Sequence, residues 1–159
     1  MRKIYLQEDS RQKKDKHTLK NEFWASQGDT VVRCKLPWGD YCKPPAISVD
    51  TKADIVEIAQ NMCGSMKEKR RFADEVKGAR DSGCKLVFLI EDARYNVVAD
   101  LYGERIHLHT GQTIGGDQLA LAMETMAARY GCEFMFCRPE DAGRVIKEVL
   151  NNEAEEKPE

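Results

Sequence analysis

The segment 39–52 holds the residues whose types and spacing suit catalysis. Asp50 and Lys52 stand two positions apart at the end of a pattern typical of a β-strand. Side chains at positions i and i+2 of a strand point to the same side of its sheet, so a carboxylate and an ammonium group should face one spot. Asp40 follows a turn ten residues before Asp50, where a neighbouring strand would bring it to the same place.

Two carboxylates, water and a lysine are a set that phosphodiester hydrolysis requires. Carboxylates and water are hard oxygen ligands of the kind that Mg²⁺ binds. A lysine beside such a metal orients the attacking water or stabilises charge on a phosphate oxygen. An Asp-x-Lys pair is common by chance, however, and without context a surface ion pair of little value to stability explains it better.

These side chains need a framework, and the hydrophobic periodicity of the chain predicts one. Strands are expected at 3–9, 29–37, 41–52 (broken by a Pro-Pro pair), 85–92 and 132–139, and helices at 18–27, 53–62, 68–82, 116–130 and 139–150. The segment 96–111 is only weakly strand-like. The order predicts an α/β domain whose helices flank both faces of a mixed central β-sheet.

Two elements carry the strongest signals. Residues 85–92, KLVFLIED, form a continuous apolar run bounded by Gly83 and Asp92, which is typical of a central strand buried on both faces. The helix at 116–130 places Leu119, Met123 and Met126 on one side and should end before Gly131. The strand at 132–139 is also expected to be buried.

Length and composition fit one folded domain. The chain has 159 residues, of which 42% are hydrophobic and 33% charged, so it can form a core and is not a disordered chain. No window approaches the roughly 18 apolar residues that cross a membrane. The N-terminus has basic residues but no apolar run behind them, so we expect no signal peptide and a cytoplasmic protein.

The formal net charge of −2 is unusual for a protein that binds nucleic acid, but its distribution matters more than its sum. Residues 153–159 hold four Glu and one Lys, a net −3, so the rest carries +1. We expect an acidic disordered tail at 153–159 after a domain at 1–152. Positive charge clusters at 11–20 and 67–71, and charge alone favours solvated surface runs as the explanation.

Other metal-binding or substrate-binding patterns are weaker. The six cysteines include no C-x-x-C pair and are interpreted as reduced thiols, mostly in the core. His107-x-His109 could bind a metal, but an exposed strand pair is the simpler interpretation. Trp24 is expected in the core, and Trp38, in the turn beside Asp40, lies either near substrate or in packing.

The whole segment 39–52 resembles the nuclease domain of the XPF family of structure-specific endonucleases, a branch of the PD-(D/E)XK superfamily with a restriction-endonuclease-like fold. Those domains carry a G-D turn and, about ten residues later, an E-R-K triplet at the end of a strand that precedes a helix. The counterparts here are Gly39-Asp40 and Asp50-Thr51-Lys52. The resemblance implies a DNA endonuclease that requires Mg²⁺ or Mn²⁺.

The resemblance extends along nearly the whole chain in the same order. The first strand of the family ends in an acidic-x-Arg-Glu motif, whose place is taken here by Asp9-Ser10-Arg11-Gln12. A later helix of the family carries Arg and, four residues on, Gln, for which Arg71 and Glu75 are the counterparts. The apolar strand that ends in Glu matches KLVFLIE, with Glu91.

The resemblance also implies roles for individual residues. Asp40 and Asp50 would hold the metal, with Asp9 assisting directly or through water. Lys52 would act on the attacking water or on the scissile phosphate. The residues expected to contact DNA phosphates are Arg11, Arg70 and Arg71.

Several positions depart from the family pattern. Asp50 replaces the usual Glu, Thr51 replaces Arg, and Gln12 replaces Glu. Val56 stands where the family has a further acid four residues after the Lys, and Glu57 is the candidate stand-in. The tandem helix-hairpin-helix domain that often follows in the family has no counterpart in these residues, so a preference for branched or flapped DNA is not implied by that module.

A second function fits the same pattern. A catalytically inactive nucleic-acid-binding or scaffold subunit would keep this fold while a partner supplies the catalysis. The departures and the near-neutral charge favour this alternative, whereas the intact Asp40, Asp50 and Lys52 favour the nuclease. Partners are expected to be DNA together with either a second copy of the chain or another protein.

Overall fold

The computed structural model describes residues 5–13, 16–34, 36, 39–43 and 47–155. The strands are β1 (Tyr5–Asp9), β2 (Thr30–Cys34), β3 (Tyr41–Lys43), β4 (Ile47–Lys52), β5 (Lys85–Ile90), β6 (Arg105–His107), β7 (Thr113–Gly115) and β8 (Glu133–Phe136). The helices are α1 (Thr18–Ser26), α2 (Ile55–Cys63), α3 (Met66–Asp81), α4 (Gly116–Tyr130) and α5 (Ala142–Glu155), with 3₁₀ turns at Val98–Leu101 and Pro139–Asp141.

The central sheet is mixed, as the sequence predicts. Its strands follow the order β2-β1-β3-β4-β5-β8. The pairs β1–β2, β4–β5 and β5–β8 are parallel, whereas β3 runs antiparallel to both β1 and β4. Strand β4, which ends in the Asp-x-Lys pair, therefore lies inside the sheet, with β3 on one side and β5 on the other.

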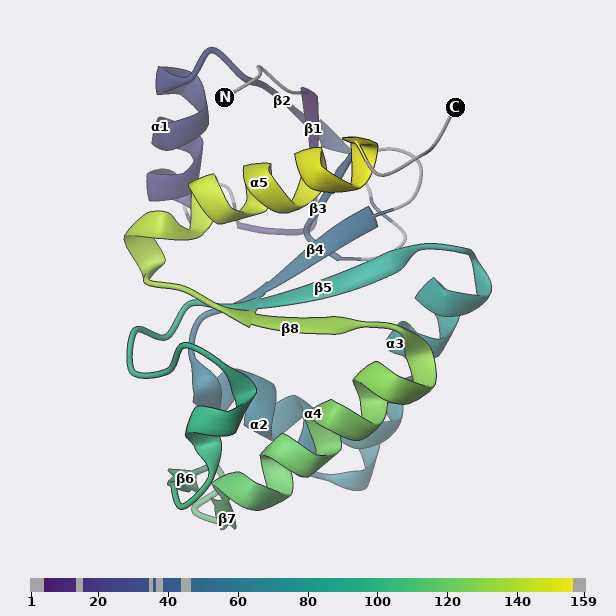
Figure 1. The fold of residues 1–159 in the computed structure, drawn as a ribbon, viewed down its shortest axis with the longest axis vertical. Coiled ribbons are helices and arrows are strands. Elements are labelled where there is room, and N and C mark those ends of the chain that lie inside the picture. Colours follow the sequence, from purple (N-terminus) through teal and green to yellow (C-terminus); the bar gives the residue numbers. More distant parts are fainter. Residues whose placement is uncertain (1–4, 14–15, 35, 37–38, 44–46, 156–159) are drawn as a thin grey trace.

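Helices cover both faces of this sheet (Figure 1). Helices α1 and α5 lie on one face and α2, α3 and α4 on the other. Each face has its own hydrophobic core. Strand β5 contributes to both, because Leu86, Phe88 and Ile90 point towards α2–α4 while Val87 and Leu89 point towards α5. The continuous apolar run thus forms a central strand that is buried on both sides, as predicted.

The two helices beneath the candidate site each begin two residues away from the predicted position, for a local reason. Asp54 accepts a hydrogen bond from Glu57 N at 2.9 Å and so caps α2, which starts at Ile55. Ser65 and Glu68 form a reciprocal capping box that starts α3 at Met66. These caps fix where α2 and α3 begin and hence which of their side chains face β4.

Buried polar contacts join α1 and α5 on the opposite face. Trp24 is fully buried, and its indole Nε1 donates a hydrogen bond to Gly143 O at 2.9 Å, so it is a core residue as predicted. Lys147 of α5 forms an ion pair with Asp29 at 2.9 Å, and both side chains are fully buried. Breaking either half would leave a buried charge without its partner, so the pair fixes α5 against this end of α1.

Three segments differ from the sequence-based predictions. The segment 96–111 contributes a 3₁₀ turn and β6, which pairs with β7 in a small hairpin outside the main sheet. Strand β8 is an edge strand and is only partly buried, because a neighbouring strand covers just one side of it. Helix α5 continues to Glu155, so it includes the first residues of the expected tail; residues 156–159 lie outside the described part of the chain.

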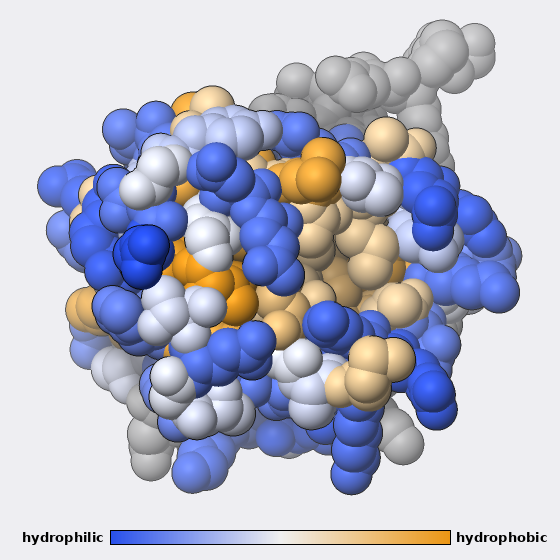
Figure 2. Space-filling model, turned by 90° about the horizontal axis from the view of Figure 1, so that it is seen from below, coloured by the Kyte–Doolittle hydropathy of each residue, from blue (hydrophilic) through white to orange (hydrophobic). Residues whose placement is uncertain are grey.

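The face at the bottom of Figure 1 carries apolar side chains among charged ones, as Figure 2 shows. The large apolar side chains that are exposed on the molecule include Met66 of α3, Leu121 of α4 and Tyr102, which follows the first 3₁₀ turn. None of the helices in the described residues is long and apolar enough to cross a membrane.

Candidate active site

The side chains of strand β4 point alternately to its two faces, so the catalytic candidates and the core residues lie on opposite faces. Ile47 and Val49 pack into the core beneath α5. Asp50 and Lys52 belong to the opposite face, and both line a cavity beside α3. Lys52 Nζ lies 3.2 Å from Asp50 Oδ1, with only about a tenth of each side chain exposed. The two-residue spacing therefore brings the carboxylate and the ammonium together, as predicted.

A glycine turn carries Asp40 to the same cavity. Gly39 has φ +69°, a left-handed conformation that side chains other than glycine's disfavour. A Cβ atom at this position would also collide with Ser48 Oγ and approach Val49 O to 3.1 Å. Glycine is thus required for both reasons, and Asp40 N can then donate to Val49 O at 2.8 Å, which fixes Asp40 beside β4.

Thr51 orients the Asp40 carboxylate. Asp40 Oδ2 accepts hydrogen bonds from Thr51 N at 2.8 Å and from Thr51 Oγ1 at 2.9 Å. The threonine that replaces the arginine of the family triplet therefore has a definite role in this chain. It holds Asp40 in one orientation next to Asp50.

Asp9 lines the cavity too, but its carboxylate is already engaged. Its backbone N donates to Asp40 O at 2.6 Å, which places β1 next to the glycine turn. Arg11 Nε lies 3.1 Å from Asp9 Oδ1 and 3.0 Å from Oδ2, and Leu36 N donates to Oδ1 at 3.3 Å. Arg11 in turn donates to Leu36 O at 2.6 Å. Asp9 and Arg11 thus hold the rim of the cavity together.

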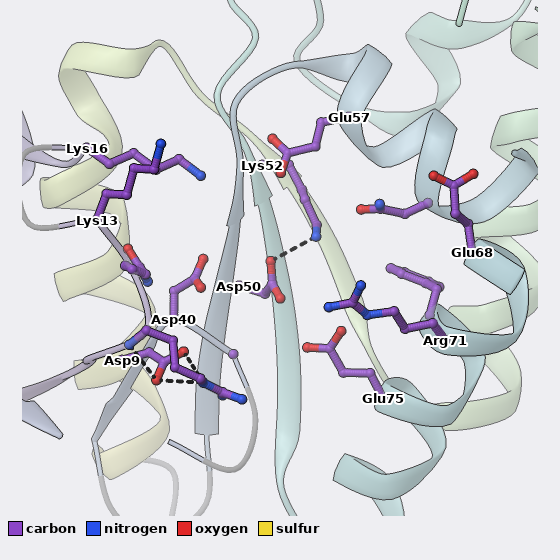
Figure 3. Close-up of a pocket in the computed structure, with 15 residues that line it drawn as sticks. Asp9, Lys13, Lys16, Asp40, Asp50, Lys52, Glu57, Glu68, Arg71 and Glu75 are labelled. Atoms are coloured by element: carbon purple, nitrogen blue, oxygen red, sulfur yellow. Dashed lines mark hydrogen bonds and ion pairs between the residues drawn. The ribbon is translucent and has the colours of Figure 1, made fainter. Parts of the chain in front are cut away.

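The cavity has a volume of about 820 Å³ and brings together residues from distant parts of the sequence (Figure 3). Its walls differ in origin. Lys13 and Lys16, from the connection between β1 and α1, lie on one side in Figure 3, and Arg71 and Glu75 of α3 lie on the other. The lining residues are Asp9, Arg11, Gln12, Lys13, Lys16, Gly39, Asp40, Asp50, Lys52, Glu57, Asn61, Glu68, Arg71, Phe72 and Glu75.

Of the arginines expected to contact DNA, Arg11 and Arg71 line this cavity. Arg70 is exposed on α3 but is not one of the lining residues, because neighbours on a helix point about 100° apart. Lys13 and Lys16 are additional cationic residues at the cavity, which sequence reasoning saw only as members of a basic run. Trp38 lies outside the described residues.

Burial makes the charged forms of the two central aspartates unfavourable. It raises the pKa of Asp40 to about 6, helped by the nearby charge of Asp50 and opposed by the hydrogen bonds from Thr51. Burial also raises the pKa of Asp50 above its usual value; Lys52 opposes this shift and Glu75 adds to it. A bound cation would remove this penalty, since it favours both carboxylates in their charged forms.

Lys52 keeps its proton in this setting. Burial by itself would lower the pKa of its ammonium group, but the carboxylates of Asp50, Glu57 and Glu75 outweigh that effect and raise the pKa. A lysine that stays charged at neutral pH cannot accept a proton from water. It can stabilise negative charge on a phosphate oxygen.

Glu75 is an acidic residue of the cavity that was not among the predicted site residues. It lies on α3 and lines the cavity, and Figure 3 shows its carboxylate directed towards Asp50 from that helix. The available signal was its position four residues after Arg71, which places both side chains on one face of a helix. Glu57, the predicted stand-in for the missing acid, also lines the cavity, but its Oε2 accepts a hydrogen bond from Ala53 N at 2.6 Å.

Three other residues singled out in the sequence lie outside the cavity lining. Glu91, at the end of β5, forms an ion pair of 2.8 Å with Lys20 of α1, and both side chains are largely buried. His107 and His109 are exposed on the β6–β7 hairpin, where His107 Nδ1 lies 2.8 Å from Thr113 Oγ1. Neither histidine faces Asp40 or Asp50 in the cavity.

The donor set suits a magnesium-type ion more than zinc. Within the described residues, no three side chains of the His, Cys, Asp and Glu types are grouped so as to hold a metal. The thiols of Cys63, Cys84, Cys132 and Cys137 are free. Mg²⁺ commonly binds through one or two carboxylates and keeps several waters, so Asp40 and Asp50 in a water-accessible cavity fit it. The Thr51 bonds to Asp40 do not exhaust its oxygens, because an ionised carboxylate offers about four lone-pair sites.

Comparisons with known proteins identify the fold. No family model and no curated protein sequence matches the chain. Among solved structures, XPF from Aeropyrum pernix matches with a TM-score of 0.65 and 18% identity over 96% of this chain and 66% of that one. XPF from Aeropyrum pernix in complex with DNA matches with a TM-score of 0.62 and 17% identity over 98% of this chain and 67% of that one.

This chain spans about two thirds of the length of those XPF chains. The match covers nearly all of its own residues. The predicted fold class, a mixed sheet with helices on both faces in the PD-(D/E)XK arrangement, is confirmed. The protein therefore has the fold of the XPF nuclease domain, the family whose motifs its sequence resembles.

Proposed function

We propose that this chain is a divalent-metal-dependent endonuclease that hydrolyses DNA phosphodiester bonds, with branched or flapped DNA as the substrate class that the XPF likeness suggests. The observation that carries the proposal is the meeting of Asp40, Asp50 and Lys52 in one cavity of about 820 Å³. Their carboxylates and ammonium come from strand β4 and the glycine turn, and each is held by specific contacts.

Each residue has a role that its surroundings support. Asp40 and Asp50 would hold Mg²⁺ or Mn²⁺, and the bound ion would supply Lewis acidity and lower the pKa of a water. Lys52, which keeps its proton, stabilises the charge that develops on the scissile phosphate. Thr51 keeps the Asp40 carboxylate in place. Asp9 does not bind the metal itself, since its carboxylate already accepts hydrogen bonds from Arg11 and Leu36. These hydrogen bonds hold the rim of the cavity in place.

The DNA backbone would cross the cavity between its two cationic walls. Lys13 and Lys16 on one side and Arg71 on the other point towards the space above Asp40 and Asp50 (Figure 3). Phosphate contacts of this kind provide most of the affinity of proteins for DNA and carry no sequence preference. The XPF structure in complex with DNA is consistent with DNA binding by this fold.

Gln12 gives a further indication that the cavity receives a polar ligand. It lines the cavity, and within the described residues both its side-chain oxygen and nitrogen are buried without a hydrogen-bond partner. Buried amide groups are normally paired, so an unpaired one at a cavity wall is suited to a substrate group.

A second candidate function is an inactive DNA-binding or scaffold subunit of the same fold. The observation in its favour is that two of the acids are already paired: Asp50 with Lys52 at 3.2 Å and Asp9 with Arg11 at 3.0 Å. Such ion pairs would cancel the negative charge that a metal ion needs at its binding site. In that case the chain would bind DNA while a partner protein cuts it.

A cleavage assay decides between the two functions. Labelled flap, fork and duplex DNA are incubated with the purified chain in Mg²⁺, in Mn²⁺ and in EDTA, with Asp40→Asn as the matched inactive control. The nuclease predicts cleavage with either metal and none in EDTA or with the variant. Retained DNA binding without cleavage of any of these substrates in either metal would establish the scaffold function and overturn the nuclease.

A further inference from the structure

We propose that a side pocket next to the cavity of Asp40 and Asp50 binds the base of an unpaired nucleotide and favours bases that carry an exocyclic amino group. The inference rests on the proposed function, because it takes DNA as the ligand. It assigns a place to a part of the DNA that the cavity itself does not hold. The side pocket has a volume of about 230 Å³ and is lined by Ala53, Asp54, Glu57, Gln60, Asn61 and His109.

The side pocket adjoins the cavity along helix α2. Glu57 and Asn61 line both spaces. Together with Asp54, the N-cap of the helix, they follow one another at intervals of three and four residues, so they lie on one face. Ile55 and Ile58 of the same helix are buried in the core and fix its rotation. A nucleotide whose phosphate lies in the cavity can therefore direct its base into the side pocket.

The opposite wall of the side pocket comes from the β6–β7 hairpin, which contacts α2 (Figure 1). His109 lies in the connection between the two strands, and its side chain is exposed. Its neighbour Leu108 is buried in the core, and Leu108 N donates a hydrogen bond to Gln112 O at 2.8 Å, which fixes the connection. The imidazole is a flat aromatic ring, and histidine is one of the side chains on which unpaired bases stack.

The α2 wall offers hydrogen-bond acceptors. Gln60 Nε2 donates to Glu68 Oε2 at 2.7 Å, which leaves the oxygen as the unpaired end of this amide. Gln60 Oε1 and Asn61 Oδ1 are both buried, and neither has a hydrogen-bond partner among the described residues. An unpaired buried oxygen is unfavourable, and a donor group in the pocket would relieve this cost. The exocyclic amino group of a base carries two N–H donors, enough for both oxygens.

The charges of the two spaces separate base from phosphate. Asp54 and Glu57 line the side pocket, and its described lining residues include no Lys or Arg. The cavity, in contrast, is lined by the cations Lys13, Lys16 and Arg71. Phosphate groups are therefore repelled from the side pocket and attracted to the cavity, whereas a neutral base fits the side pocket. A base in a duplex is stacked between its neighbours and cannot enter a pocket, so the occupant must be unpaired.

The test compares two forked DNAs that share one duplex and differ only in their single-stranded arms, which are all deoxycytidine or all thymidine. Cytosine carries an amino donor where thymine carries a carbonyl acceptor. Fluorescence anisotropy in EDTA, at neutral to weakly basic pH, measures binding of the unmodified chain without cleavage. The chain should bind the cytidine fork about fivefold more tightly, the factor that corresponds to one net hydrogen bond.

Variants assign the preference to the side pocket. His109→Ala removes the stacking surface and should weaken binding of both forks about fivefold or more. His107→Ala is the matched control, because His107 is exposed on the same hairpin but does not line the side pocket; it should change either affinity less than about twofold. Gln60→Met keeps the length but removes the acceptor, and it should reduce the preference for cytidine to less than about twofold. Glu68 keeps its hydrogen bond from Ser65 N at 2.9 Å in that variant.

Binding of a blunt duplex serves as the control for folding. Its bases are paired and cannot enter the side pocket, so its affinity should be the same for the unmodified chain and for all three variants. A variant that loses duplex binding as well is misfolded, and the comparison of the two forks on the unmodified chain then decides the question alone.

The outcomes distinguish this inference from the proposed function. Equal affinities of the unmodified chain for the two forks, or equal effects of the two histidine variants, would overturn the side pocket; metal-dependent cleavage of the forks would then leave the nuclease intact. A cytidine preference that depends on Gln60, without cleavage in Mg²⁺ or Mn²⁺, would support the side pocket and overturn the nuclease. If the chain binds neither fork, DNA is not its ligand, and both proposals fail.

Discussion

The ammonium nitrogen of Lys52 lies 3.2 Å from Oδ1 of Asp50, on the face of β4 that lines the cavity. This ion pair links the group proposed to bind the metal to the group proposed to act on the phosphate. A metal at Asp50 would compete with Lys52 for the same carboxylate, which would release the ammonium towards substrate. Substitutions at the two positions should therefore differ in their effects on metal binding, stability and cleavage.

Asp50→Asn should abolish most cleavage without harming the fold. The variant removes a charge from the proposed metal seat, so cleavage should fall by at least about 100-fold. Burial raises the pKa of Asp50, which means that its charged form is unfavourable in the folded chain. Lys52 loses its partner in this variant but keeps the nearby carboxylates of Glu57 and Glu75, so the melting temperature at pH 8 without metal should stay the same or rise. Turnover and melting curves check this, and a much lower melting temperature would make Asp50 a structural residue.

Lys52→Ala should reduce cleavage and stability but not metal binding, in contrast to Asp50→Asn. Mn²⁺ binding should be largely retained, because the ammonium is not a ligand, while cleavage falls by roughly 100- to 1,000-fold. Removing the cation leaves Asp50 buried without its partner, which should lower stability in metal-free buffer by up to roughly 3 kcal/mol. Calorimetry with Mn²⁺, together with urea unfolding in EDTA and in Mn²⁺, measures both effects. A variant that loses Mn²⁺ binding as completely as Asp50→Asn would contradict the assigned role.

Stability without metal should fall as the pH rises. Burial raises the pKa of Asp40 from 3.8 to about 6, so the folded chain binds this proton more tightly than the unfolded chain does. The stabilisation is fully present at pH values below 3.8 and is lost as the pH rises through about 6. Urea unfolding between pH 4 and pH 8 (roughly the range of the shift) should show the decline.

Two controls accompany the pH measurement. Asp40→Asn lacks the titrating group, so its stability should change less over the same range. Saturating Mn²⁺ at neutral pH should restore stability to the unmodified chain, since the metal favours the charged carboxylates. An equally steep decline in Asp40→Asn would assign the pH dependence to other groups.

Arg71 and its neighbour Arg70 provide a matched test of the DNA path. Arg71 lines the cavity and Arg70 does not, although both are exposed cations on α3. Arg71→Ala should weaken DNA binding and reduce the slope of log affinity against log salt by about 1, as expected for the loss of one phosphate contact. Arg70→Ala should change both much less. Fluorescence anisotropy in EDTA measures binding without cleavage. Equal effects of the two variants would mean that the DNA does not pass through the cavity.

Gly39→Ala should disturb both the fold and the metal seat. Gly39 has φ +69°, and an added Cβ would collide with Ser48 Oγ. The left-handed conformation alone costs roughly 1–2 kcal/mol for a residue with a side chain. Adding Ser48→Gly removes the collision but not the conformational cost, so it should recover part of the lost stability and Mn²⁺ affinity. Unfolding experiments and calorimetry on the single and double variants test this, and a Gly39→Ala chain of normal stability would contradict the role of the turn.

The sequence by itself was sufficient for the features that local patterns determine. The apolar run at 85–92 predicted a central strand because a strand covered on both faces is apolar at consecutive positions. The two-residue spacing of Asp50 and Lys52 placed them on one face of β4, since the side-chain period of a strand is fixed. The motifs around Gly39 and Asp40 predicted the XPF fold, which the structural comparisons confirm.

Only the tertiary structure decided which residues from separate elements meet. The rotation of α3 depends on the packing of Phe72 and Val76 in the core, and this rotation directs Glu75 and Arg71 to the cavity while Arg70 points elsewhere. Likewise, packing brings Leu36 to the cavity rim, where its backbone N donates to Asp9 Oδ1 and its backbone O accepts from Arg11, although 27 and 25 positions of the chain separate these residues. Such contacts are long-range results of packing, which no local period in the sequence records.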